Sequence, residues 1–495
     1  MSDIDDLSVL VVGAGFGGLS AGAHLADAGA SVRVLEKNDQ VGGRASTLER
    51  DGFRFDMGPS WYLMPDVFER FFGHFDREPA DYYALEQLDP HYRVFFKDGD
   101  RADMRGDRAH VRDLFESYSD GAGAAFQEYV QTSASHYETA MEHFVYEDRH
   151  RLRDYLDPAV LRAAPVGLKL LGSMQGHVED YFDHPKLQQL VQYTLVFLGG
   201  APANTPALYH IMSHVDVDLG VHYPDGGMAA VADAVADLAT ERGVTIETGA
   251  EVAEVTKRRE GFYVETVAGE THHPDVVVSN ADYAHTELDL LPAHERQGDA
   301  DYWDSRTYAP SAFLLYLGVE GDVDPLAHHT LVLPDDWDPH FERIFDDPAW
   351  PQDPAYYCCV PSQTDDDVAP DGHSNLFVLV PIAPGLDDGP GTRERFRDRV
   401  LADLADHTGL DVRDRIVVEE TFTVSEFADR YNARQGTALG LAHTLRQTGP
   451  LRPDIRSSAV DGLYFAGGYT TPGVGVPMCL ISGEHAAEAV LEEHT

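Results

Sequence analysis

The first 40 residues alternate between apolar runs and a glycine-rich turn. Residues 8–12 are apolar, glycines stand at positions 13, 15, 17 and 18, and residues 19–28 carry apolar side chains at helical spacing. Gly29 ends the predicted helix, and a second apolar run covers residues 31–36. A buried strand, a helix and another buried strand in this order predict a βαβ unit at the start of the chain.

The pattern changes character twice farther along the chain. Residues 108–212 have mainly helical spacing, whereas residues 228–239 predict a helix among strands at 244–248, 252–255, 262–267 and 276–279. Residues 306–319 and 375–382 predict strands of a second sheet, and a strand, a turn and a helix follow from residue 462. We therefore predict two discontinuous domains, an α/β domain of residues 1–100, 222–290 and 445–495 and an inserted α+β domain of residues 101–221 and 291–444.

The charge balance is strongly acidic, with 37 basic and 85 acidic residues and a formal net charge of −48. No nucleic-acid partner is predicted, because phosphate binding needs a basic face. The acids are spread along the whole chain, so their mutual repulsion has to be screened, and we expect the cytoplasm of a salt-loving organism. The first six residues lack the form of a secretory signal, and no apolar run reaches the roughly 18 residues that cross a bilayer. We expect a cytoplasmic protein that does not span a membrane.

No metal site is predicted from the three cysteines and 24 histidines. Cys358 and Cys359 are adjacent, and neither they nor Cys479 has a metal-ligand spacing. His328 and His329 are adjacent too, and neighbouring side chains on a strand point to opposite faces, so the pair is a poor chelator.

The N-terminal glycine turn has the spacing of a dinucleotide site. Gly13 permits the tight turn after the strand, Gly15 lets the backbone approach a pyrophosphate, and Gly18 lets the helix pack against the strand. The phosphate charge would then lie at the helix N-terminus. Glu36 ends the second strand 18 residues beyond Gly18, where a carboxylate can accept hydrogen bonds from ribose hydroxyls.

Further glycine turns favour FAD over NAD, because a NAD domain has no use for them. Gly42 and Gly43 make a second close turn after the acidic strand end, and Arg44 offers a planar fork to phosphate. Residues 55–60 add a third turn. Residues 462–478 form an apolar strand that leads through a glycine- and proline-rich loop into a helix, whose N-terminus would stabilise negative charge on a reduced flavin.

Five segments together resemble the bacterial and archaeal phytoene desaturase family of carotenoid desaturases, within the wider amine-oxidase-like flavoproteins. They are residues 12–19, 41–44, 55–60, 223–228 (Tyr-Pro-Asp-Gly-Gly-Met) and 463–482. Residues 184–187 and 201–209 also resemble this family, so the likeness runs from residue 9 to residue 485. The resemblance implies a Rossmann-type FAD-binding domain with an inserted substrate domain, and a FAD-dependent carotenoid desaturase acting on CH–CH groups.

The resemblance also implies, position by position, the residues around FAD. The adenosine and diphosphate would be held by Gly13, Ala14, Gly15, Gly18, Glu36, Gly43 and Arg44, with Val252 against adenine. The further predicted cofactor-binding residues are Gly17, Lys37 and Gly58. The flavin would be bordered by Gly467, Gly468, Val476, Pro477 and Met478. Many wider relatives place an acid after the C-terminal glycine, where this chain has Tyr469, and this departure weakens an amine-oxidase interpretation.

Desaturation removes hydrogen from two adjacent carbons, once as hydride and once as a proton. The cation left in a polyene is allylic and delocalised, so the protein mainly positions the chain and excludes water. No catalytic residue is assigned, and structural roles are favoured for the polar candidates Asp225, Glu426 and His443. Since the sequence carries no second redox motif, oxygen or a membrane quinone is the implied electron acceptor.

A polyene substrate would enter from a bilayer, which implies peripheral association with the cell membrane. Residues 158–174 concentrate leucine, valine and methionine between few charges and are the predicted entrance, with a core helix as the alternative. The substrate stays open between phytoene, on the way to lycopene, and a later intermediate that needs a 3,4-type double bond, on the way to C50 bacterioruberin. The other hypotheses are an amine oxidase or a polyene saturase of the same fold and a non-enzymatic carotenoid carrier.

The net charge predicts a strong dependence of stability on salt. Salt at about 1 M shortens the Debye length to roughly 3 Å, whereas at about 0.1 M it is roughly 10 Å and the acids repel one another. Dialysis to about 0.1 M salt should therefore unfold or aggregate the protein. The melting temperature, followed by circular dichroism across a salt series, checks this, and a melting temperature independent of salt would contradict the halophilic assignment.

Overall fold

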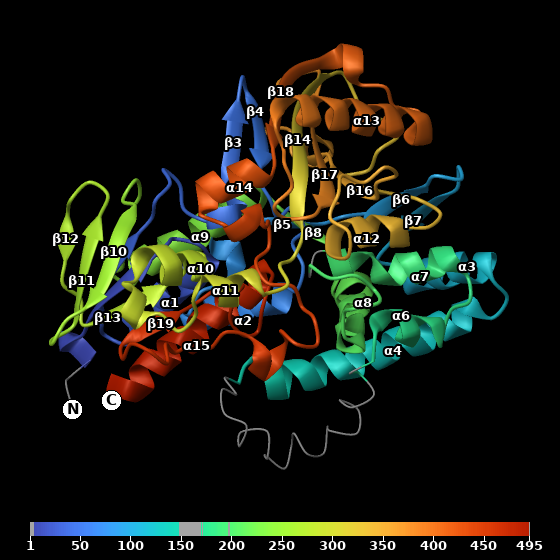
Figure 1. Cartoon of the computed structure of the whole chain (residues 1–495). Helices are drawn as coiled ribbons and strands as arrows, with labels where there is room; N and C mark the ends of the chain where they lie inside the picture. The colour runs from blue at the N-terminus through green and yellow to red at the C-terminus, as the bar shows by residue number, and fades with distance from the viewer. Residues whose placement is uncertain (1–3, 148–169, 171, 197–198, 495) are drawn as a thin grey trace.

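The computed structural model describes residues 4–147, 170, 172–196 and 199–494. A five-stranded sheet lies near the two termini (Figure 1), in the order β19-β13-β1-β2-β9, and each strand runs parallel to its neighbours. Its strands are β1 (Ser8–Val12), β2 (Ser31–Leu35), β9 (Thr245–Glu247), β13 (Val276–Ser279) and β19 (Leu463–Phe465). The sheet thus combines segments from the beginning, the middle and the end of the chain.

A seven-stranded sheet forms the other large layer, in the order β18-β14-β17-β16-β15-β6-β7. Its strands are β6 (Tyr92–Phe96), β7 (Arg101–Met104), β14 (Ser311–Glu320), β15 (His329–Leu333), β16 (Tyr356–Cys359), β17 (His373–Ile382) and β18 (Ile416–Phe422). The pairings are antiparallel except that β6 runs parallel to β15. Helix α13 (Pro390–Thr408) covers one face, where Phe396 and Leu404 share a buried cluster with Leu315.

The remaining elements surround these two sheets. A group of helices lies beside the seven-stranded sheet in Figure 1: α3 (Arg108–Tyr118), α4 (Ala122–Ala140), α6 (Met174–Glu179), α7 (Pro185–Gln192) and α8 (Met212–His214). The smaller sheets pair β3 (Thr47–Arg50) with β4 (Phe53–Asp56), β5 (Leu85–Gln87) with β8 (His222–Pro224), and β10 (Val252–Lys257) with β11 (Phe262–Thr266) and β12 (Thr271–His272). The other helices are α1 (Phe16–Asp27), α2 (Pro65–His74), α9 (Gly227–Glu241), α10 (Tyr283–His285), α11 (Ala300–Asp304), α12 (Asp338–Phe345), α14 (Val424–Tyr431) and α15 (Val476–His494).

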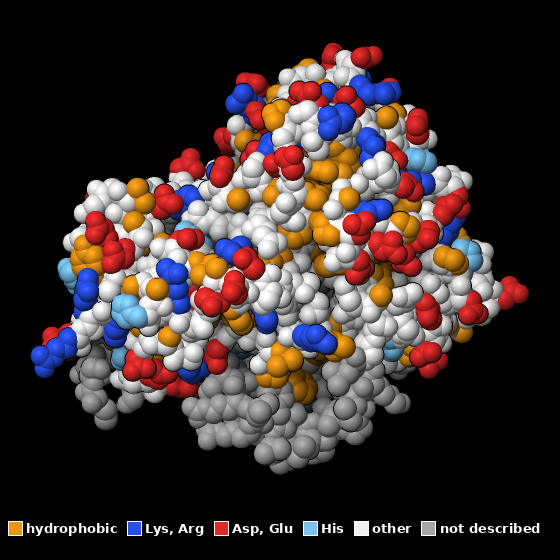
Figure 2. Space-filling view, in the orientation of Figure 1, with side chains coloured by type: hydrophobic (Ala, Val, Ile, Leu, Met, Phe, Trp, Pro, Cys, Tyr) orange, Lys and Arg blue, Asp and Glu red, His pale blue; other side chains and the backbone are white. Residues whose placement is uncertain are grey.

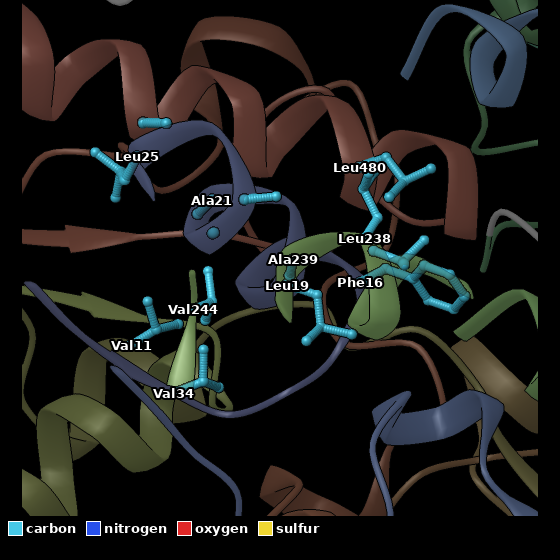
Figure 3. Close-up of a cluster of buried hydrophobic side chains, with 14 of the residues drawn as sticks. Val11, Phe16, Leu19, Ala21, Leu25, Val34, Leu238, Ala239, Val244 and Leu480 are labelled. Atoms are coloured by element: carbon cyan, nitrogen blue, oxygen red, sulfur yellow. The ribbon is translucent and has the colours of Figure 1, made fainter. Parts of the chain in front are cut away.

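Helix α1 lies at the centre of the core that covers one face of the parallel sheet (Figure 3). Its side chains Leu19 and Leu25 belong to one buried cluster with Val11 of the sheet and Leu480 of α15. Helix α15 approaches α1 closely, because a Cβ on Gly483 would lie only 2.4 Å from the carbonyl oxygen of Gly17. The C-terminal helix is therefore fixed directly on the N-terminal βαβ unit that the sequence predicted.

The Tyr-Pro-Asp-Gly-Gly-Met segment ties the β3–β4 ribbon to helix α9. Asp56, the last residue of β4, accepts hydrogen bonds from the backbone N–H groups of Met228 and Ala229 at 3.0 and 3.3 Å. Gly227 has a φ of +76°, and a Cβ there would lie 2.6 Å from Asp56 Oδ2. The second glycine of the segment therefore leaves room for the carboxylate that satisfies the start of the helix.

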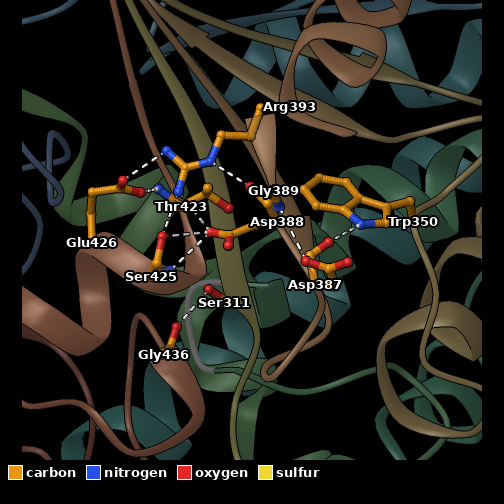
Figure 4. A network of polar contacts seen from close by, with 10 residues as sticks. All are labelled: Ser311, Trp350, Asp387, Asp388, Gly389, Arg393, Thr423, Ser425, Glu426 and Gly436. Carbon is orange, nitrogen blue, oxygen red and sulfur yellow. Dashed lines mark hydrogen bonds and ion pairs between the residues drawn. The ribbon is translucent and has the colours of Figure 1, made fainter. Parts of the chain in front are cut away.

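Arg393 links helix α13 to helix α14 (Figure 4). Its guanidinium donates to Glu426 Oε1 at 2.7 Å and to Asp388 Oδ2 at 3.0 Å. The other oxygen of Glu426 accepts from the backbone N–H of Thr423 in a capping box at the start of α14. Glu426 thus connects helix α13 to helix α14. Asp225, another polar candidate of the sequence analysis, is exposed.

The surface carries the acidic charge without concentrating it. Aspartate and glutamate side chains are spread widely over the coloured part of the face shown in Figure 2, with hydrophobic and basic side chains between them. This distribution agrees with acids scattered along the sequence. Within the described ranges, no helix combines the length and the apolarity that crossing a bilayer requires.

The packing of Asp56 predicts an unequal response to alanine at two glycines of positive φ. Gly227→Ala should destabilise the protein by about 1–2 kcal/mol of backbone strain plus about 1.5–3 kcal/mol for the disturbed hydrogen bonds of a charged group. Gly243→Ala is the matched control, since Gly243 has a φ of +99° and nothing within 4 Å of its Cβ position. Urea unfolding at fixed high salt measures both, and equal losses of unfolding free energy would contradict the role given to Asp56.

Candidate functional site

A cavity of about 1100 Å³ extends from the parallel sheet to the seven-stranded sheet. At one end it is lined by the turns that follow β1, β2 and β13, and at the other by Leu314 of β14, Tyr357 of β16 and Leu379 of β17. Between them runs the C-terminal loop that follows β19. The cavity therefore reaches the carboxyl ends of parallel strands, where α/β folds bind ligands, and continues into an apolar space beyond.

Most residues assigned to the cofactor from the sequence lie in the wall of this cavity. They are Gly13, Gly15, Gly17, Glu36, Lys37, Gly43, Arg44, Gly58, Val252, Gly467, Gly468, Val476, Pro477 and Met478. Ala14 and Gly18 are not in the wall. The backbone N–H of Ala14 donates to Glu36 Oε2 at 2.7 Å, and a Cβ on Gly18 would lie 2.2 Å from the carbonyl oxygen of Gly13, so both act behind the wall.

Two glycine turns and Asn280 meet where the N-terminal and C-terminal parts of the wall join. A Cβ on Gly15 would lie 2.6 Å from Asn280 Oδ1, and a Cβ on Gly17 would lie 2.8 Å from the backbone nitrogen of Gly467. Asn280 Nδ2 donates to the carbonyl oxygen of Ala466 at 2.9 Å. The wall at this point consists of glycine backbone and the Asn280 side chain, so a phosphate group can approach the main-chain N–H groups of the glycine turn.

Glu36 and Lys37, side by side at the end of β2, differ in what they offer the cavity. The Glu36 carboxylate accepts from the backbone N–H of Ala14 at Oε2, and from the backbone N–H and the side-chain amide of Asn38 at Oε1, which orients it while Oε2 keeps a second lone pair. Lys37 Nζ donates to the carbonyl oxygen of Asp429 at 2.6 Å and to Asn432 Oδ1 at 2.8 Å. Glu36 is therefore placed to accept from a ligand, whereas the ammonium of Lys37 is engaged at helix α14.

The Arg44 guanidinium has buried donors that an anion could accept from. Its Nε and Nη2 atoms are buried and have no hydrogen-bond partner among the residues that the structure describes. The guanidinium carbon lies 5.6 Å from the centre of the Tyr431 ring. Since a buried guanidinium with unmet donors is costly, an anionic group in this part of the cavity would complete its hydrogen bonds, as phosphate does in a bidentate pair.

Tyr469, which stands where an acid was expected in wider relatives, is locked in place by a neighbouring carboxylate. Its hydroxyl donates to Asp282 Oδ2, and both residues line the cavity. Burial raises the pKa of Asp282 above its ordinary value. The Tyr469–Asp282 pair therefore joins the loop after β19 to the segment after β13.

His443 and Tyr209 line the cavity beside the same loop. His443 Nε2 accepts from the backbone N–H of Val474 at 3.0 Å, and its Nδ1 contacts the Tyr209 hydroxyl. Burial holds the pKa of His443 well below its usual range and raises the pKa of Tyr209 to about 12. Both groups therefore stay neutral at neutral pH.

The far end of the cavity carries a few polar groups in an aromatic setting. The hydroxyls of Ser60 and Tyr357, both in the wall, lie 2.9 Å apart, and Tyr357 contacts His329 Nδ1 at 2.7 Å. The Trp61 ring stacks on His329 with centroids 4.1 Å apart. These groups fix the shape of the apolar end by hydrogen bonds between themselves.

The prediction that His328 and His329 point to opposite faces is wrong. Their ring centroids are 4.6 Å apart, and a ligand atom of each lies within 4.8 Å of the other and of the Cys359 thiol. The reason is that His328 precedes the first residue of β15, so the alternation of strand side chains does not apply to it. This buried group has donor types found in metal sites, which its sequence spacing did not reveal.

Two exposed hydrophobic side chains lie in the wall of the cavity. Phe144 and Leu445 line it and are 38% and 46% exposed, and Leu451 nearby in the sequence is 59% exposed. Most of the predicted entrance, residues 158–174, lies outside the described residues. Of its described part, Leu170 is buried and lines the cavity, and Met174 is buried in the core of the helical group.

Several residues of the wall were not found from the sequence. Asn280, Asp282 and Tyr431 carry no motif of their own, and they reach the cavity only through the pairing of distant segments. The one available signal was position, because Asn280 directly follows a predicted strand at the edge where glycine turns gather.

Comparison with known proteins agrees with this geometry. A family model described as flavin containing amine oxidoreductase matches residues 16–491. The chain is 70% identical over 493 residues, covering 100% of both chains, to a carotenoid 3,4-desaturase of Haloarcula japonica. It is 33% identical over 493 residues to a zeta-carotene-forming phytoene desaturase of Myxococcus xanthus, covering 98% of this chain and 93% of that one.

Solved structures share the fold at low sequence identity. Wild-type putrescine oxidase bound to putrescine aligns with a TM-score of 0.63 and 16% identity, covering 98% of this chain and 99% of that one. An oxidoreductase of Methanosarcina mazei aligns with a TM-score of 0.62 and 17% identity, covering 97% and 100%. The chain therefore belongs to the flavin-containing amine oxidoreductase family and, within it, to the carotenoid desaturases.

Proposed function

We propose that this protein is an FAD-dependent desaturase that introduces C=C bonds into an acyclic carotenoid. The observation that carries the proposal is the 70% identity, over the full length of both chains, to a carotenoid 3,4-desaturase. That relative favours a 3,4-type double bond in a later intermediate, on the way to a C50 pigment such as bacterioruberin, over the desaturation of phytoene. The length and apolar lining of the cavity support a hydrocarbon substrate.

FAD is the flavin that the cavity wall fits best. Glu36 would accept from the ribose, the turn at Gly13–Gly15 and the unmet donors of Arg44 would hold the diphosphate, and Val252 would lie against adenine. The flavin ring would be bordered by Gly467, Gly468 and the start of α15. When bound, the flavin supplies the acceptor for the hydrogen that leaves the carotenoid as hydride.

The protein's own part in the reaction is to position the polyene and keep water out. The strands β14, β16 and β17 line the apolar end of the cavity, so a linear hydrocarbon can lie with one bond at the C-terminal loop and the rest along the seven-stranded sheet. We propose that this sheet belongs to the substrate domain and the parallel sheet to the cofactor domain. Because β6 and β7 are part of the seven-stranded sheet, the first boundary would lie before Tyr92 rather than at residue 100.

We further propose peripheral attachment to a membrane, with oxygen or a membrane quinone as the terminal electron acceptor. A carotenoid is insoluble in water, so it has to pass from a bilayer into the cavity. The exposed side chains of Phe144, Leu445 and Leu451 support a docking edge, since burying one such side chain contributes roughly 1.5–3 kcal/mol. The high salt that the acidic surface needs would also screen its repulsion from anionic lipid.

The proposed activity is tested with purified protein, FAD and an acyclic carotenoid in liposomes. Each new conjugated C=C bond should shift the carotenoid absorption to longer wavelength, and liquid chromatography with mass spectrometry should show a loss of two hydrogens per step. Gly15→Ala should lower the affinity for flavin at least tenfold and lose product with it, because a Cβ there would lie 2.6 Å from Asn280 Oδ1 and displace the turn that would hold the diphosphate.

Gly22→Ala is the matched control for that variant. Gly22 lies in helix α1, which begins directly after Gly15, and a Cβ there would make ordinary contacts of 3.6 Å with Val32 and Val34. This variant should keep both flavin and activity. Full flavin content in Gly15→Ala, or flavin-loaded wild-type protein that leaves every acyclic carotenoid unchanged, would contradict the proposal.

The docking edge predicts a selective effect of charge on membrane binding. Leu445→Asp combined with Leu451→Asp should lower co-sedimentation with liposomes several-fold and slow turnover, while flavin content stays normal. Val267→Asp is the control, since Val267 is 65% exposed but follows β11 in the three-stranded sheet. Equal binding by all three proteins would show that the docking surface lies elsewhere.

A further inference from the structure

The loop beside the proposed flavin position is held from behind by a buried guanidinium. Arg452 is only 6% exposed. It donates to the carbonyl oxygens of Leu441 and Gln447 at 3.3 and 3.1 Å, and to those of Gly468 and Tyr469 at 2.6 and 3.2 Å. Arg452 therefore ties the loop that follows β19 to the chain segment that precedes it.

The positive charge of Arg452 has no carboxylate partner within the described part of the chain. Among the residues that the structure describes, no carboxylate oxygen lies within the 4.0 Å of an ion pair with it, and the groups that act on it are Tyr209, Tyr469 and Cys479. Burial lowers the pKa of Arg452 to about 10, so it stays charged at neutral pH. Carbonyl dipoles alone compensate a buried charge poorly, and a negative group nearby would stabilise it.

The cavity is the place where such a negative group would lie. Gly468 and Tyr469, whose carbonyl oxygens face Arg452, both line it. The Gly468 carbonyl oxygen accepts from the guanidinium of Arg452. Because the peptide group between Gly468 and Tyr469 is planar and trans, the N–H of Tyr469 points in the opposite direction. The charge of Arg452 and the dipole of this peptide therefore add up to a positive potential on the far side of the loop.

The surroundings of Arg452 preserve this potential. His443 lies close enough for Arg452, together with burial, to hold its pKa well below the usual range, so no second positive charge forms there. Because Arg452 is buried, its field is screened only weakly, even in high salt. A group that becomes negative in this part of the cavity would be stabilised by a fixed, permanent charge.

We propose that Arg452 is a positioning residue that favours reduction of the flavin, because it stabilises the negative charge of the reduced ring through the Gly468–Tyr469 peptide. The inference rests on the proposed flavin site and adds to it a residue that sets the reduction potential. Charge near the ring is one of the means by which a protein tunes such a cofactor.

The test separates the charge of Arg452 from its hydrogen bonds. Arg452→Gln keeps an amide donor for the carbonyl oxygens and removes the charge, whereas Arg452→Lys keeps the charge and loses most donors. Arg446→Gln is the control, since Arg446 is an exposed arginine of the same segment. For each protein, the measurements are flavin content, unfolding temperature, the dissociation constant of the flavin–sulfite adduct and the midpoint potential of the flavin.

Sulfite is the probe because its adduct places negative charge on the flavin ring without any substrate. Arg452→Gln should weaken sulfite binding at least tenfold and lower the midpoint potential by about 30 mV, the equivalent of a tenfold change for a two-electron couple. Arg452→Lys should stay within threefold of the wild type, and Arg446→Gln should not change.

The outcomes distinguish this inference from the proposed function. Flavin-loaded Arg452→Gln with wild-type sulfite affinity and potential would overturn the role of Arg452 and leave the flavin site standing. Equal changes in sulfite affinity and midpoint potential in Arg452→Gln and Arg452→Lys would show that Arg452 has only a structural role. Loss of flavin together with a lowered unfolding temperature in both variants would show the same. Wild-type protein that binds no flavin at all would instead contradict the proposed function.

Discussion

The site depends on one close approach of backbone to backbone around the start of helix α1. A Cβ on Gly18 would lie 2.2 Å from the carbonyl oxygen of Gly13, and one on Gly17 would lie 2.8 Å from the nitrogen of Gly467. Since these glycines carry no side chain, the turn after β1 meets the loop after β19 directly, beside the Asn280 side chain, and the two form one continuous wall. Helix α15, which packs as closely on α1 through Gly483, then fixes the far end of the C-terminal loop. Such a wall presents main-chain N–H groups, which are suited to binding phosphate.

The electrostatics of the interior and of the surface are arranged differently. The acids that dominate the chain are spread over the outside, where salt screens them, whereas Arg44 and Arg452 hold buried positive charge beside the cavity. Screening acts on exposed charges and much less on buried ones. High salt around the exposed acids would therefore leave the positive potential beside the cavity largely intact.

The parts of the fold that could be predicted from the sequence are those that depend on local patterns of apolar and polar residues. The strand at Ser8–Val12 and the strand at Val276–Ser279 have the predicted bounds, because their apolar runs are short and flanked by turns. The parallel pairing of β6 with β15 joins Arg93 to Thr330, and no local pattern indicates a partner so distant. Arg452 and Asn280 were missed for the same reason: each acts on backbone groups that only the tertiary fold brings near.

The state of His443 and Tyr209 bears on how the reaction loses its proton. Nε2 of His443 accepts from the backbone N–H of Val474, so the neutral imidazole carries its proton on Nδ1, which faces Tyr209. His443 therefore has no free lone pair with which to act as a base. Tyr209, with a pKa raised to about 12 by burial, does not ionise at neutral pH either. These two groups suit orientation rather than proton abstraction. A delocalised polyene cation releases its proton readily, so a water-poor cavity that fixes the bond beside the flavin meets the main need of the chemistry without a strong base.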